Sequence, residues 1–171
     1  MKLTNEIIYF KIPELIDKEN VEAYIKEFKA KDLKIYGTGG LDKEISYEDW
    51  LKNLELKNQL PDLVPATQFL VYRCQDNRLI GMVNIRHYLN KTLKEHGGHI
   101  GQSVRPSEQA KGYGTMQIAL ALKYLKQLNQ REVLMTCNAD NIASIKSILN
   151  NGGVEDSSLN KEIKKFWIKN Y

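Results

Sequence analysis

The sequence predicts a single α/β domain in which helices pack against a mixed β-sheet. Three observations lead to this fold class. The chain has 171 residues, which is the usual size of one domain. Its apolar residues switch between helical spacing and the short continuous runs that are typical of buried strands. The expected order of elements is β, α, α, β, β, β, α, β, α, β, which a mixed sheet with helices can accommodate.

The N-terminal third is expected to contain one strand and two helices. Residues 7–12 form an apolar run that ends at Pro13, as expected of a short strand. Between residues 17 and 30, the apolar positions repeat at i, i+3, i+4 and i+7 and therefore share one helix face. A second helix is expected after Ser46, because a serine hydroxyl suits an N-cap and two acidic residues follow it.

The middle of the chain is expected to form a hairpin and then a crossover. Residues 67–74 and 79–88 are two apolar runs separated by a polar turn. The segments 99–105, 113–128 and 132–137 indicate strand, helix and strand. Because a strand–helix–strand crossover joins parallel strands, we expect the first and last of these segments to be parallel.

The C-terminal part is expected to contain a helix at residues 141–151, ended by Gly152 and Gly153, and a strand at residues 163–168. This last strand can be an internal strand, or it can be an exposed edge that pairs with a second copy of the chain. Monomer and homodimer therefore both remain open.

Composition and charge exclude several classes of protein. Hydrophobic residues make up 42% and charged residues 27% of the chain, as in ordinary globular domains and unlike disordered or collagen-like chains. The net charge is only +4, and lysines alternate with acidic residues almost everywhere. One basic cluster stands out, formed by Lys161, Lys164, Lys165 and Lys169 and interrupted by Glu162; we interpret it as a solvated face. We therefore expect no nucleic-acid partner.

Membrane and metal partners are not expected either. No run approaches the roughly 18 apolar residues that a membrane-spanning helix needs. Residues 1–6 include an acidic residue and no apolar signal-peptide core, so we expect a cytoplasmic protein. The two cysteines, Cys74 and Cys137, stand alone in apolar runs and are expected to be buried free thiols. We therefore expect no metal site.

The segment most informative about function runs from Val104 to Thr115. A strand stops at Pro106, a loop with Gly112 and Gly114 follows, and then a helix begins. This arrangement directs unpaired N–H groups and the positive end of the helix dipole toward one point, which favours an anion such as a pyrophosphate. The sequence of a P-loop is absent, and Gln117 replaces the third glycine of a dinucleotide fingerprint. A purely structural glycine turn is the alternative.

The residues Gln109-Ala110-Lys111-Gly112-Tyr113-Gly114 match the [QR]-x-x-G-x-[GA] signature of one known family. In this segment and in the later Asn141–Ser144 helix that ends at Gly152-Gly153, the chain resembles the GCN5-related N-acetyltransferases (GNAT), in particular bacterial stand-alone acetyltransferases of unassigned substrate. The resemblance implies a single domain over residues 1–171. It also implies a mixed, mostly antiparallel central sheet of about six to seven strands with helices on both faces.

The resemblance further implies a binding site for acetyl-CoA as co-substrate. Backbone amides of the signature would hold the pyrophosphate, and the end of the preceding strand, bulged and splayed from its neighbour in this family, would pair with the pantetheine arm. The N–H group of Val104 would polarise the thioester carbonyl. Asn141 would reach the pantetheine or its neighbouring backbone, with a helix N-cap as a compatible second role. The cofactor-binding residues implied are Ser103, Val104, Arg105, Gln109, Ala110, Lys111, Gly112, Tyr113, Gly114, Thr115, Asn141 and Ser144.

The family reaction is direct attack of a neutral amine on acetyl-CoA in a ternary complex, which requires a general base and can use a general acid. In many members a tyrosine seven residues after the asparagine that corresponds to Asn141 acts as the general acid, but Ile148 occupies that position here. We take Ser144 as the candidate acid, with Cys137 as a weaker alternative. We take His99 as the candidate base. His87, Glu95 and water-mediated transfer are the other options.

The resemblance predicts an acyltransferase that moves an acetyl group to a primary amine of an unidentified small molecule or protein. The alternative is a CoA-binding regulatory or interaction module with little catalysis. In the N-terminal region, where this fold builds its acceptor site, Glu44, Glu48 and Asp49 either attract a cationic amine or form a solvated helix face. Tyr36, Tyr47 and Trp50 either line that pocket or belong to the core.

Overall fold

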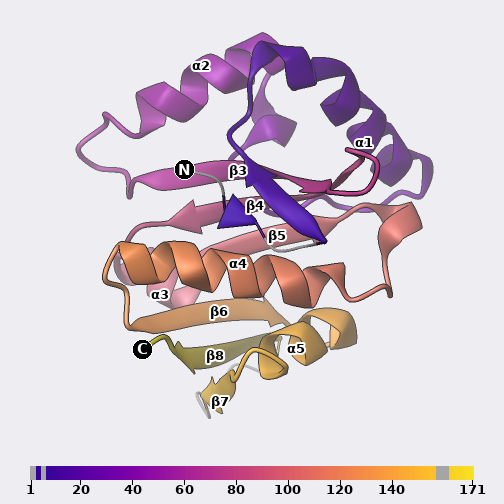
Figure 1. The fold of residues 1–171 in the computed structure, drawn as a ribbon. Helices are drawn as coiled ribbons and strands as arrows, with labels where there is room; N and C mark the ends of the chain where they lie inside the picture. The colour runs from indigo at the N-terminus through magenta and orange to yellow at the C-terminus, as the bar shows by residue number, and fades with distance from the viewer. Residues whose placement is uncertain (1–2, 5–6, 157–161) are drawn as a thin grey trace.

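The computed structural model describes residues 3–4, 7–156 and 162–171. Within these ranges the strands form one sheet of five, in the order β1-β2-β3-β4-β5, and one of three, in the order β6-β8-β7 (Figure 1). The strands are β1 (Leu3–Thr4), β2 (Ile8–Lys11), β3 (Ala66–Arg73), β4 (Leu79–Arg86), β5 (Ile100–Val104), β6 (Glu132–Asn138), β7 (Val154–Asp156) and β8 (Ile163–Lys169). The helices are α1 (Lys18–Ala30), α2 (Tyr47–Lys57), α3 (Lys91–Glu95), α4 (Tyr113–Gln127) and α5 (Ile142–Leu149), with 3-10 turns at Leu15–Asp17, Leu41–Lys43 and Pro106–Glu108.

The expected α/β architecture is confirmed, with neighbouring strands antiparallel in both sheets. The division of the strands into two sheets was not predicted from the sequence. Nor were β1, β7, α3 and the 3-10 turns, because they are too short to show a periodic pattern. The expected N-cap is present, since Ser46 Oγ accepts a hydrogen bond from the N–H of Asp49 at 3.1 Å.

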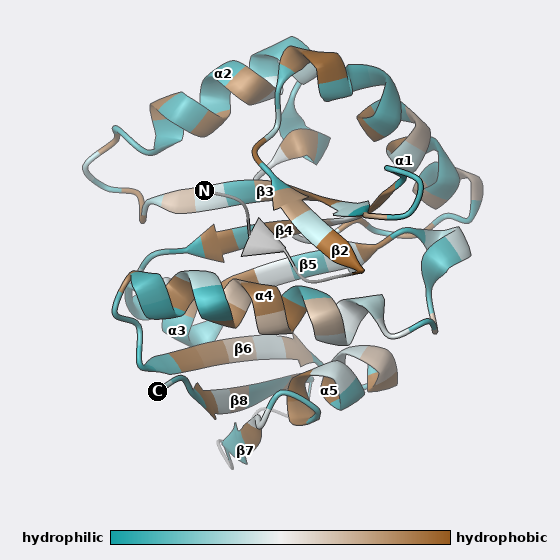
Figure 2. Ribbon diagram, viewed as in Figure 1, coloured by the Kyte–Doolittle hydropathy of each residue, from teal (hydrophilic) through white to brown (hydrophobic). Residues whose placement is uncertain are grey.

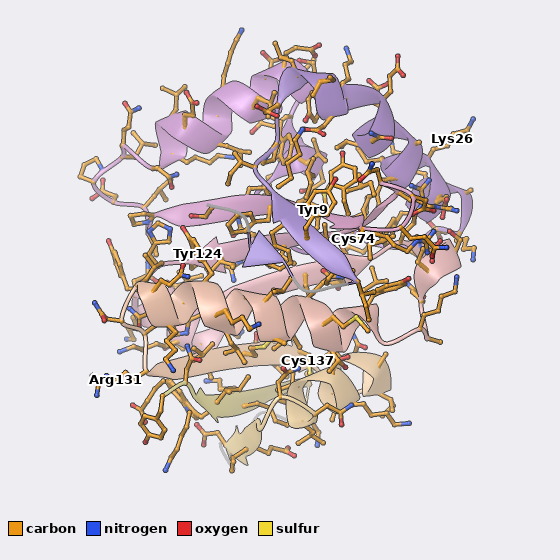
Figure 3. The ribbon with its side chains drawn as sticks, viewed as in Figure 1. Tyr9, Lys26, Cys74, Tyr124, Arg131 and Cys137 are labelled. Carbon is orange, nitrogen blue, oxygen red and sulfur yellow. The ribbon has the colours of Figure 1, made fainter. Side chains whose placement is uncertain are left out.

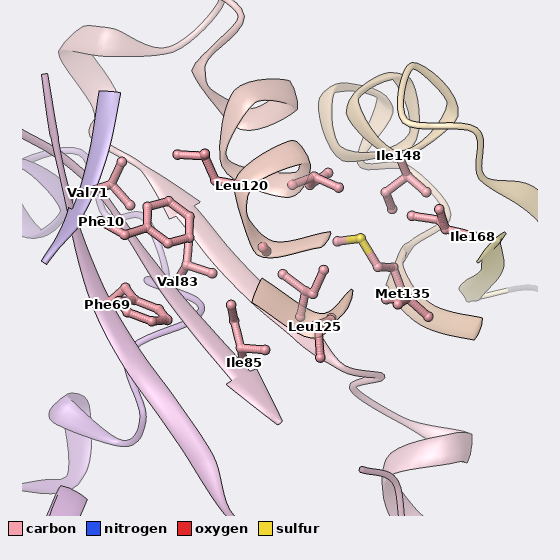
Figure 4. Packing of buried hydrophobic residues seen from close by; sticks show 14 of the residues in the cluster. Phe10, Phe69, Val71, Val83, Ile85, Leu120, Leu125, Met135, Ile148 and Ile168 are labelled. Atoms are coloured by element: carbon pink, nitrogen blue, oxygen red, sulfur yellow. The ribbon is translucent and has the colours of Figure 1, made fainter. Parts of the chain in front are cut away.

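Two apolar cores lie on opposite faces of the five-stranded sheet. On one face, α1 and α2 bury Tyr24, Trp50 and their neighbours against Leu70 and Met82. On the other face, α4 lies between the two sheets, and Figure 4 shows Leu120 and Leu125 between Val83 and Ile85 on one side and Met135 and Ile168 on the other. Hydropathy colouring shows apolar residues along the strands and polar residues over the outer sides of α1 and α2 (Figure 2). Helices therefore cover both faces, as predicted.

The strands β5 and β6 run in the same direction on either side of the α4 crossover (Figure 1). Their parallel direction agrees with the expectation for a crossover, but the two strands do not belong to one sheet. In the described chain their pairing is limited to one isolated antiparallel bridge between Gly98 and Met135. Each strand is hydrogen-bonded along its length to another partner, β4 for β5 and β8 for β6, so the two strands separate after this bridge.

The expected bulge in β5 is not present. Its register with β4 is continuous from Gly81–Val104 to Ile85–Ile100, and the irregularity lies instead between Val71 and Tyr72 in β3. The splayed strand is therefore separated from β6 without a bulge of its own.

The C-terminal strand β8 is internal, because β6 and β7 pair with its two edges. In the basic cluster, Lys164 pairs with Glu155 at 2.9 Å, and Lys161 lies outside the described residues. Positions 1–2 and 5–6, part of the segment considered as a signal peptide, also lie outside them. The cysteines also differ from expectation: Cys74 is exposed in the turn after β3, and Cys137 is half-buried near the end of β6 (Figure 3). Cys74 is exposed because the strand ends at Arg73 and the next residue starts the turn.

Candidate active site

The loop between β5 and α4 carries a row of unpaired backbone donors. It passes through a 3-10 turn at Pro106–Glu108 and then adopts left-handed conformations at Ala110 (φ 61°) and Gly112 (φ 84°). Gly112 is the N-cap of α4, and no side chain caps this helix. Within the described chain, none of the N–H groups of residues 109–115 donates a hydrogen bond. This end of the 15-residue helix α4 is therefore suited to bind an anion.

A buried carboxylate fixes the start of this loop. Glu108 has a side chain only 3% exposed and pairs with Arg73 at 2.8 Å, Lys111 at 2.9 Å and Arg78 at 3.4 Å. Burial alone raises the pKa of Glu108, but the hydrogen bond from Lys111 and the charge of Arg73 outweigh it and hold that pKa below its ordinary value. The side chain of Lys111 is thus tied back to the loop.

The side chains of Ser103 and Arg105 point to α1 rather than toward the loop. Arg105 Nε donates to Glu27 at 2.6 Å, and the hydroxyl of Ser107 donates to the same carboxylate at 2.8 Å. The buried hydroxyl of Tyr24 donates to Ser103 Oγ at 2.9 Å. The side chains of these two predicted cofactor-binding residues are therefore engaged within the fold, and the N–H of Arg105 is bonded to β4.

The free edge of β5 faces the gap between the sheets. The N–H of Arg105 donates to the carbonyl of Ile80 at 2.7 Å, and in an antiparallel ladder the hydrogen-bonded positions alternate. The main-chain groups of Gln102 and Val104 therefore point away from β4, toward β6. The carbonyl of Val104 accepts from Gln109 Nε2 at 3.1 Å. Gln102 Oε1 is buried, and the described residues offer it no hydrogen-bond partner.

Helix α5 closes the site from the second sheet. Asn141 is its N-cap and accepts from the N–H of Ser144 at 3.0 Å, which confirms the structural role considered for it. Burial raises the pKa of the neighbouring Cys137 thiol, and an interaction with Ser144 partly opposes the rise. Ile148 is fully buried in the core and offers no acidic group.

Packing between α4 and α5 leaves little room for a side chain at the second signature glycine. A Cβ atom on Gly114 would lie 3.1 Å from Ser147 Oγ and 3.8 Å from a methyl group of Val104. Asn151 Nδ2 donates to the carbonyl of Thr115 at 3.1 Å and joins the same two helices. The first turn of α4, the end of β5 and α5 therefore converge at Gly114.

His99 lies where the two sheets meet and is 4% exposed. Its Nδ1 accepts a hydrogen bond from the N–H of Leu134 in β6 at 3.0 Å. Burial, with a smaller effect of the Arg86 charge, lowers the pKa of His99 to about 4. Because Nδ1 accepts, the proton of the neutral ring is on Nε2, and the ring can take a second proton only by losing its bond to Leu134.

The other predicted bases lie outside this convergence. His87 Nε2 bonds to Thr67 Oγ1 at 2.8 Å, and burial lowers the pKa of this histidine. Glu95 is exposed at the end of α3. Neither side chain has a described contact with the loop or with the free edge of β5.

Comparison with known proteins assigns the family. A profile of the Acetyltransferase (GNAT) family matches residues 23–148. The chain belongs to this family. No curated protein matches the chain as a whole sequence.

Solved structures share the GNAT fold over nearly the full chain. An acetyltransferase of the GNAT family from Bacillus anthracis is 19% identical with a TM-score of 0.67, covering 99% of each chain. A ribosomal L7/L12 alpha-N-protein acetyltransferase in complex with coenzyme A is 15% identical with a TM-score of 0.69, covering 99% of this chain and 98% of that one. A spermidine/spermine N-acetyltransferase from Vibrio cholerae is 21% identical with a TM-score of 0.63, covering 97% and 95%. At these identities the likeness establishes the fold.

In this GNAT protein, the acidic residues proposed to attract an amine are engaged within the fold. Glu44 pairs with Lys57 at 3.2 Å, and Glu48 pairs with Lys18 at 2.8 Å. Asp49 accepts from the hydroxyl of Ser46. The alternative of a solvated helix face therefore fits Glu48 and Asp49, whereas Glu44 lies before α2 with a side chain only 14% exposed. Tyr47 and Trp50 are core residues, whereas Tyr36 is 48% exposed.

Sequence reasoning missed two features of this GNAT site. One is Gln102, a polar residue in the middle of a strand, where an apolar residue would be the default; that anomaly is a usable signal. The other is the Glu108–Arg73 pair, whose partners are 35 positions apart and carry no local signal. No helix in the described ranges is long and apolar enough to cross a membrane. No three His, Cys, Asp or Glu side chains in those ranges group as a metal site.

Proposed function

We propose that this GNAT protein is an acetyl-CoA-dependent N-acetyltransferase that transfers acetyl to a primary amine by direct attack in a ternary complex, with residues 1–171 forming one catalytic domain. The observation that supports this most is the row of unpaired N–H groups at residues 109–115, next to the free edge of β5. The proposed reaction uses no metal, nucleic acid or membrane. We propose that it takes place in the cytoplasm.

The residues present fit the two ends of the co-substrate. The amides of residues 109–115 hold the pyrophosphate, and the left-handed Gly112 leaves that approach open because it has no side chain. The backbone of residues 103–105 runs alongside the pantetheine arm, with Gln102 Oε1 as an additional acceptor for one of its amides. Asn141 and Ser144 lie on the opposite side, at the start of α5.

The co-substrate supplies an acetyl group activated as a thioester. The amine nitrogen forms a bond to the acetyl carbon, the carbon–sulfur bond breaks, the nitrogen loses a proton and the sulfur gains one. The N–H of Val104 faces the carbonyl oxygen, on which negative charge grows in the transition state. One such donor lowers the activation barrier by about 3 kcal/mol. Ser144 is the proposed proton donor to sulfur.

The role of His99 as general base stays a prediction. Its Nδ1 can take a proton only after the hydrogen bond from the N–H of Leu134 breaks. Transfer of the amine proton through water requires no such opening. The alternative function is a CoA-binding module with little catalysis. It is supported by Ile148, which is buried and occupies the position of the tyrosine that acts as general acid in many family members.

Isothermal titration with acetyl-CoA and with CoA, using ATP and NAD as controls, tests the proposal. We expect micromolar binding of acetyl-CoA that is lost in Gly112→Glu. Gly152→Glu is the matched control: Gly152 is also left-handed, at φ 79°, and a Cβ there meets nothing within 4 Å. If acetyl-CoA does not bind the wild-type protein, the loop is only a turn and the enzyme proposal is wrong. Binding without release of thiol for any amine supports the module instead.

The acceptor class is tested by thiol release with panels of amines. The structural neighbours include enzymes named for a ribosomal protein and for spermidine and spermine, so protein N-termini and polyamines belong in the panel. A structural feature of this chain points to a third class.

A further inference from the structure

A pocket of about 360 Å³ lies beside β4, on the face covered by α2. Leu54 of α2, Leu63 of the following loop, Asn84 and Arg86 of β4 and Thr92 of α3 contribute to its wall. This volume is in the range of pockets for small molecules. The pocket combines an apolar side with several hydrogen-bonding side chains, which is the usual composition of a specific site.

Arg86 brings an unneutralised charge to this pocket. Its Nη1 donates to the carbonyls of Gly97 and Gly98 at 3.2 and 2.9 Å, which fixes the guanidinium plane. Among the described residues, no carboxylate lies within ion-pair distance of Arg86, and Nε and Nη2 have no hydrogen-bond partner. Burial lowers the pKa of Arg86, in keeping with a cation held without a counter-ion. A guanidinium with a free edge is suited to bidentate binding of a carboxylate.

The other charges around the pocket do not neutralise Arg86. No aspartate or glutamate is among the described residues that line the pocket. Lys57 is the other charged residue of the lining, and it already pairs with Glu44 at 3.2 Å. The pocket therefore carries a net positive charge and disfavours a polycation.

The pocket adjoins the proposed place of acetyl transfer through β5. A Cβ atom on Gly101 would lie 3.7 Å from Arg86 Nη2, so this strand passes directly by the guanidinium. The next residue, Gln102, already has its main chain on the free edge that faces β6. From Gly101 to Val104 is three residues of extended chain, or about 10 Å. A small molecule can span that distance between an anionic group at Arg86 and an amine near Val104.

We propose that this pocket binds the carboxylate of the acceptor, so that the acceptor is a small amine that also bears a carboxylate, such as an amino acid, rather than a polyamine. The proposal rests on the acetyltransferase function proposed above. Arg86 supplies the charge-assisted contact and Asn84 and Thr92 add neutral polar groups, while the amine extends toward the free edge of β5.

The first experiment compares each of the twenty common amino acids with its own carboxamide, and both with spermidine, in thiol release from acetyl-CoA. We expect turnover for at least one acid, with its carboxamide and spermidine at least about tenfold poorer in kcat/KM, since a charge-assisted bidentate contact is lost. Equal or better rates for the carboxamides or for spermidine would overturn the carboxylate proposal and leave the acetyltransferase function standing.

Two variant pairs locate the effect. Arg86→Gln should raise KM for the amino acid about tenfold or more and should change KM for the carboxamide little. The control is Arg131→Gln, at an exposed arginine between α4 and β6 (Figure 3), which should change neither KM value. Because Arg86 also holds the Gly97–Gly98 turn, its loss can affect folding. Thr92→Glu on the exposed α3 supplies a competing carboxylate, and Thr92→Gln is its uncharged match. Equal KM values in the Thr92 pair would contradict the proposal.

A binding measurement separates this proposal from the enzyme proposal. NMR titration of the protein without acetyl-CoA should show the amides of Gly98 and Gly101 shifting with an amino acid and not with its carboxamide, and not in Thr92→Glu. If acetyl-CoA fails to bind, the enzyme proposal is wrong, and this titration still decides whether the pocket takes carboxylates. If no amino acid shifts these amides, the pocket proposal is wrong even if acetyl transfer to another amine is found.

Discussion

His99 Nδ1 accepts a hydrogen bond from the backbone N–H of Leu134 at 3.0 Å, and the N–H of His99 donates to the carbonyl of the same residue at 2.7 Å. One histidine, directly before β5, therefore makes both a backbone and a side-chain bond to β6. These bonds lie at the point from which the two sheets diverge. A residue predicted as a catalytic base thus holds the two sheets together at the origin of the splay.

This relationship predicts that the protein loses stability in mild acid. The pKa of His99 is lowered to about 4 in the folded state, from 6.5, so the unfolded chain binds the proton more readily. The stabilisation is complete above pH 6.5, falls as the pH drops, and is gone near pH 4; its full size is about 3 kcal/mol. Denaturant titrations between pH 4 and 7.5 measure it.

His99→Gln is the informative variant for this prediction, because an amide oxygen can accept the same hydrogen bond and does not titrate. The stability difference between wild type and variant should change with pH across that window. His87→Gln serves as the control at a half-buried histidine. A difference that does not vary with pH would contradict the prediction. If His99→Gln also retains acetyl transfer, His99 is a positioning residue and not the base.

Removing the buried carboxylate of Glu108 should loosen the anion-binding loop. Glu108→Gln leaves Arg73, Lys111 and Arg78 without their shared partner, at a cost of about 2 kcal/mol after allowing for the partial exposure of these cations. Affinity for acetyl-CoA should fall as well, because the loop that bears the amides is less ordered. Urea denaturation and titration calorimetry measure the two effects. Glu95→Gln, on an exposed residue of α3, should alter neither.

Restoring a tyrosine at position 148 should not restore a general acid. Ile148 is fully buried, and its Cγ2 would lie 2.5 Å from a Cβ on Gly153. A larger ring overfills this site, so Ile148→Tyr should destabilise the protein by about 2 kcal/mol without raising kcat. Ile142→Tyr, on a position of the same helix that is 57% exposed, should be nearly neutral. A higher kcat for Ile148→Tyr would show that position 148 can face the sulfur.

Replacing alanine by glycine should have opposite effects at two positions. Ala110 is left-handed at φ 61°, which costs a residue with a Cβ about 1 kcal/mol, so Ala110→Gly should raise the melting temperature or leave it unchanged and should keep acetyl-CoA binding. Ala119 lies within α4, where the same exchange should cost about 1 kcal/mol. Thermal unfolding of both variants measures this. A loss at Ala110 equal to that at Ala119 would argue against strain in the loop.

Several parts of the site could be predicted from sequence because their signals are local. The left-handed Gly112 at the start of α4, the N-caps at Ser46 and Asn141, and the ends of the strand and helix around the signature all depend on residues a few positions apart. Backbone conformation and hydrogen bonding within one turn determine them. Hydrogen-bonded positions alternate along β5, so its register with β4 directs the main-chain groups of Val104 toward the gap between the sheets.

Other parts depend on residues that meet only in the folded chain. The burial of His99 against Leu134, the Glu108–Arg73 ion pair and the close packing of Gly114 against Ser147 join residues 33 to 35 positions apart. No pattern along the chain indicates these contacts. The division into two sheets was missed for the same reason, since the partner of each strand is chosen by long-range pairing.

The sequence by itself determined the α/β class, the order of the main elements and the anion-binding turn, because propensity, periodicity and glycine conformation act over short stretches of chain. Only the tertiary structure decided which side chains are free to act. In the folded chain Arg105, Glu44 and His99 bond to groups that are distant in sequence. Arg86 is held by two carbonyls beside β5 and has no counter-ion among the residues that the structure describes. The availability of a side chain depends on its three-dimensional neighbours, because burial and pairing determine its charge, its pKa and its remaining hydrogen bonds.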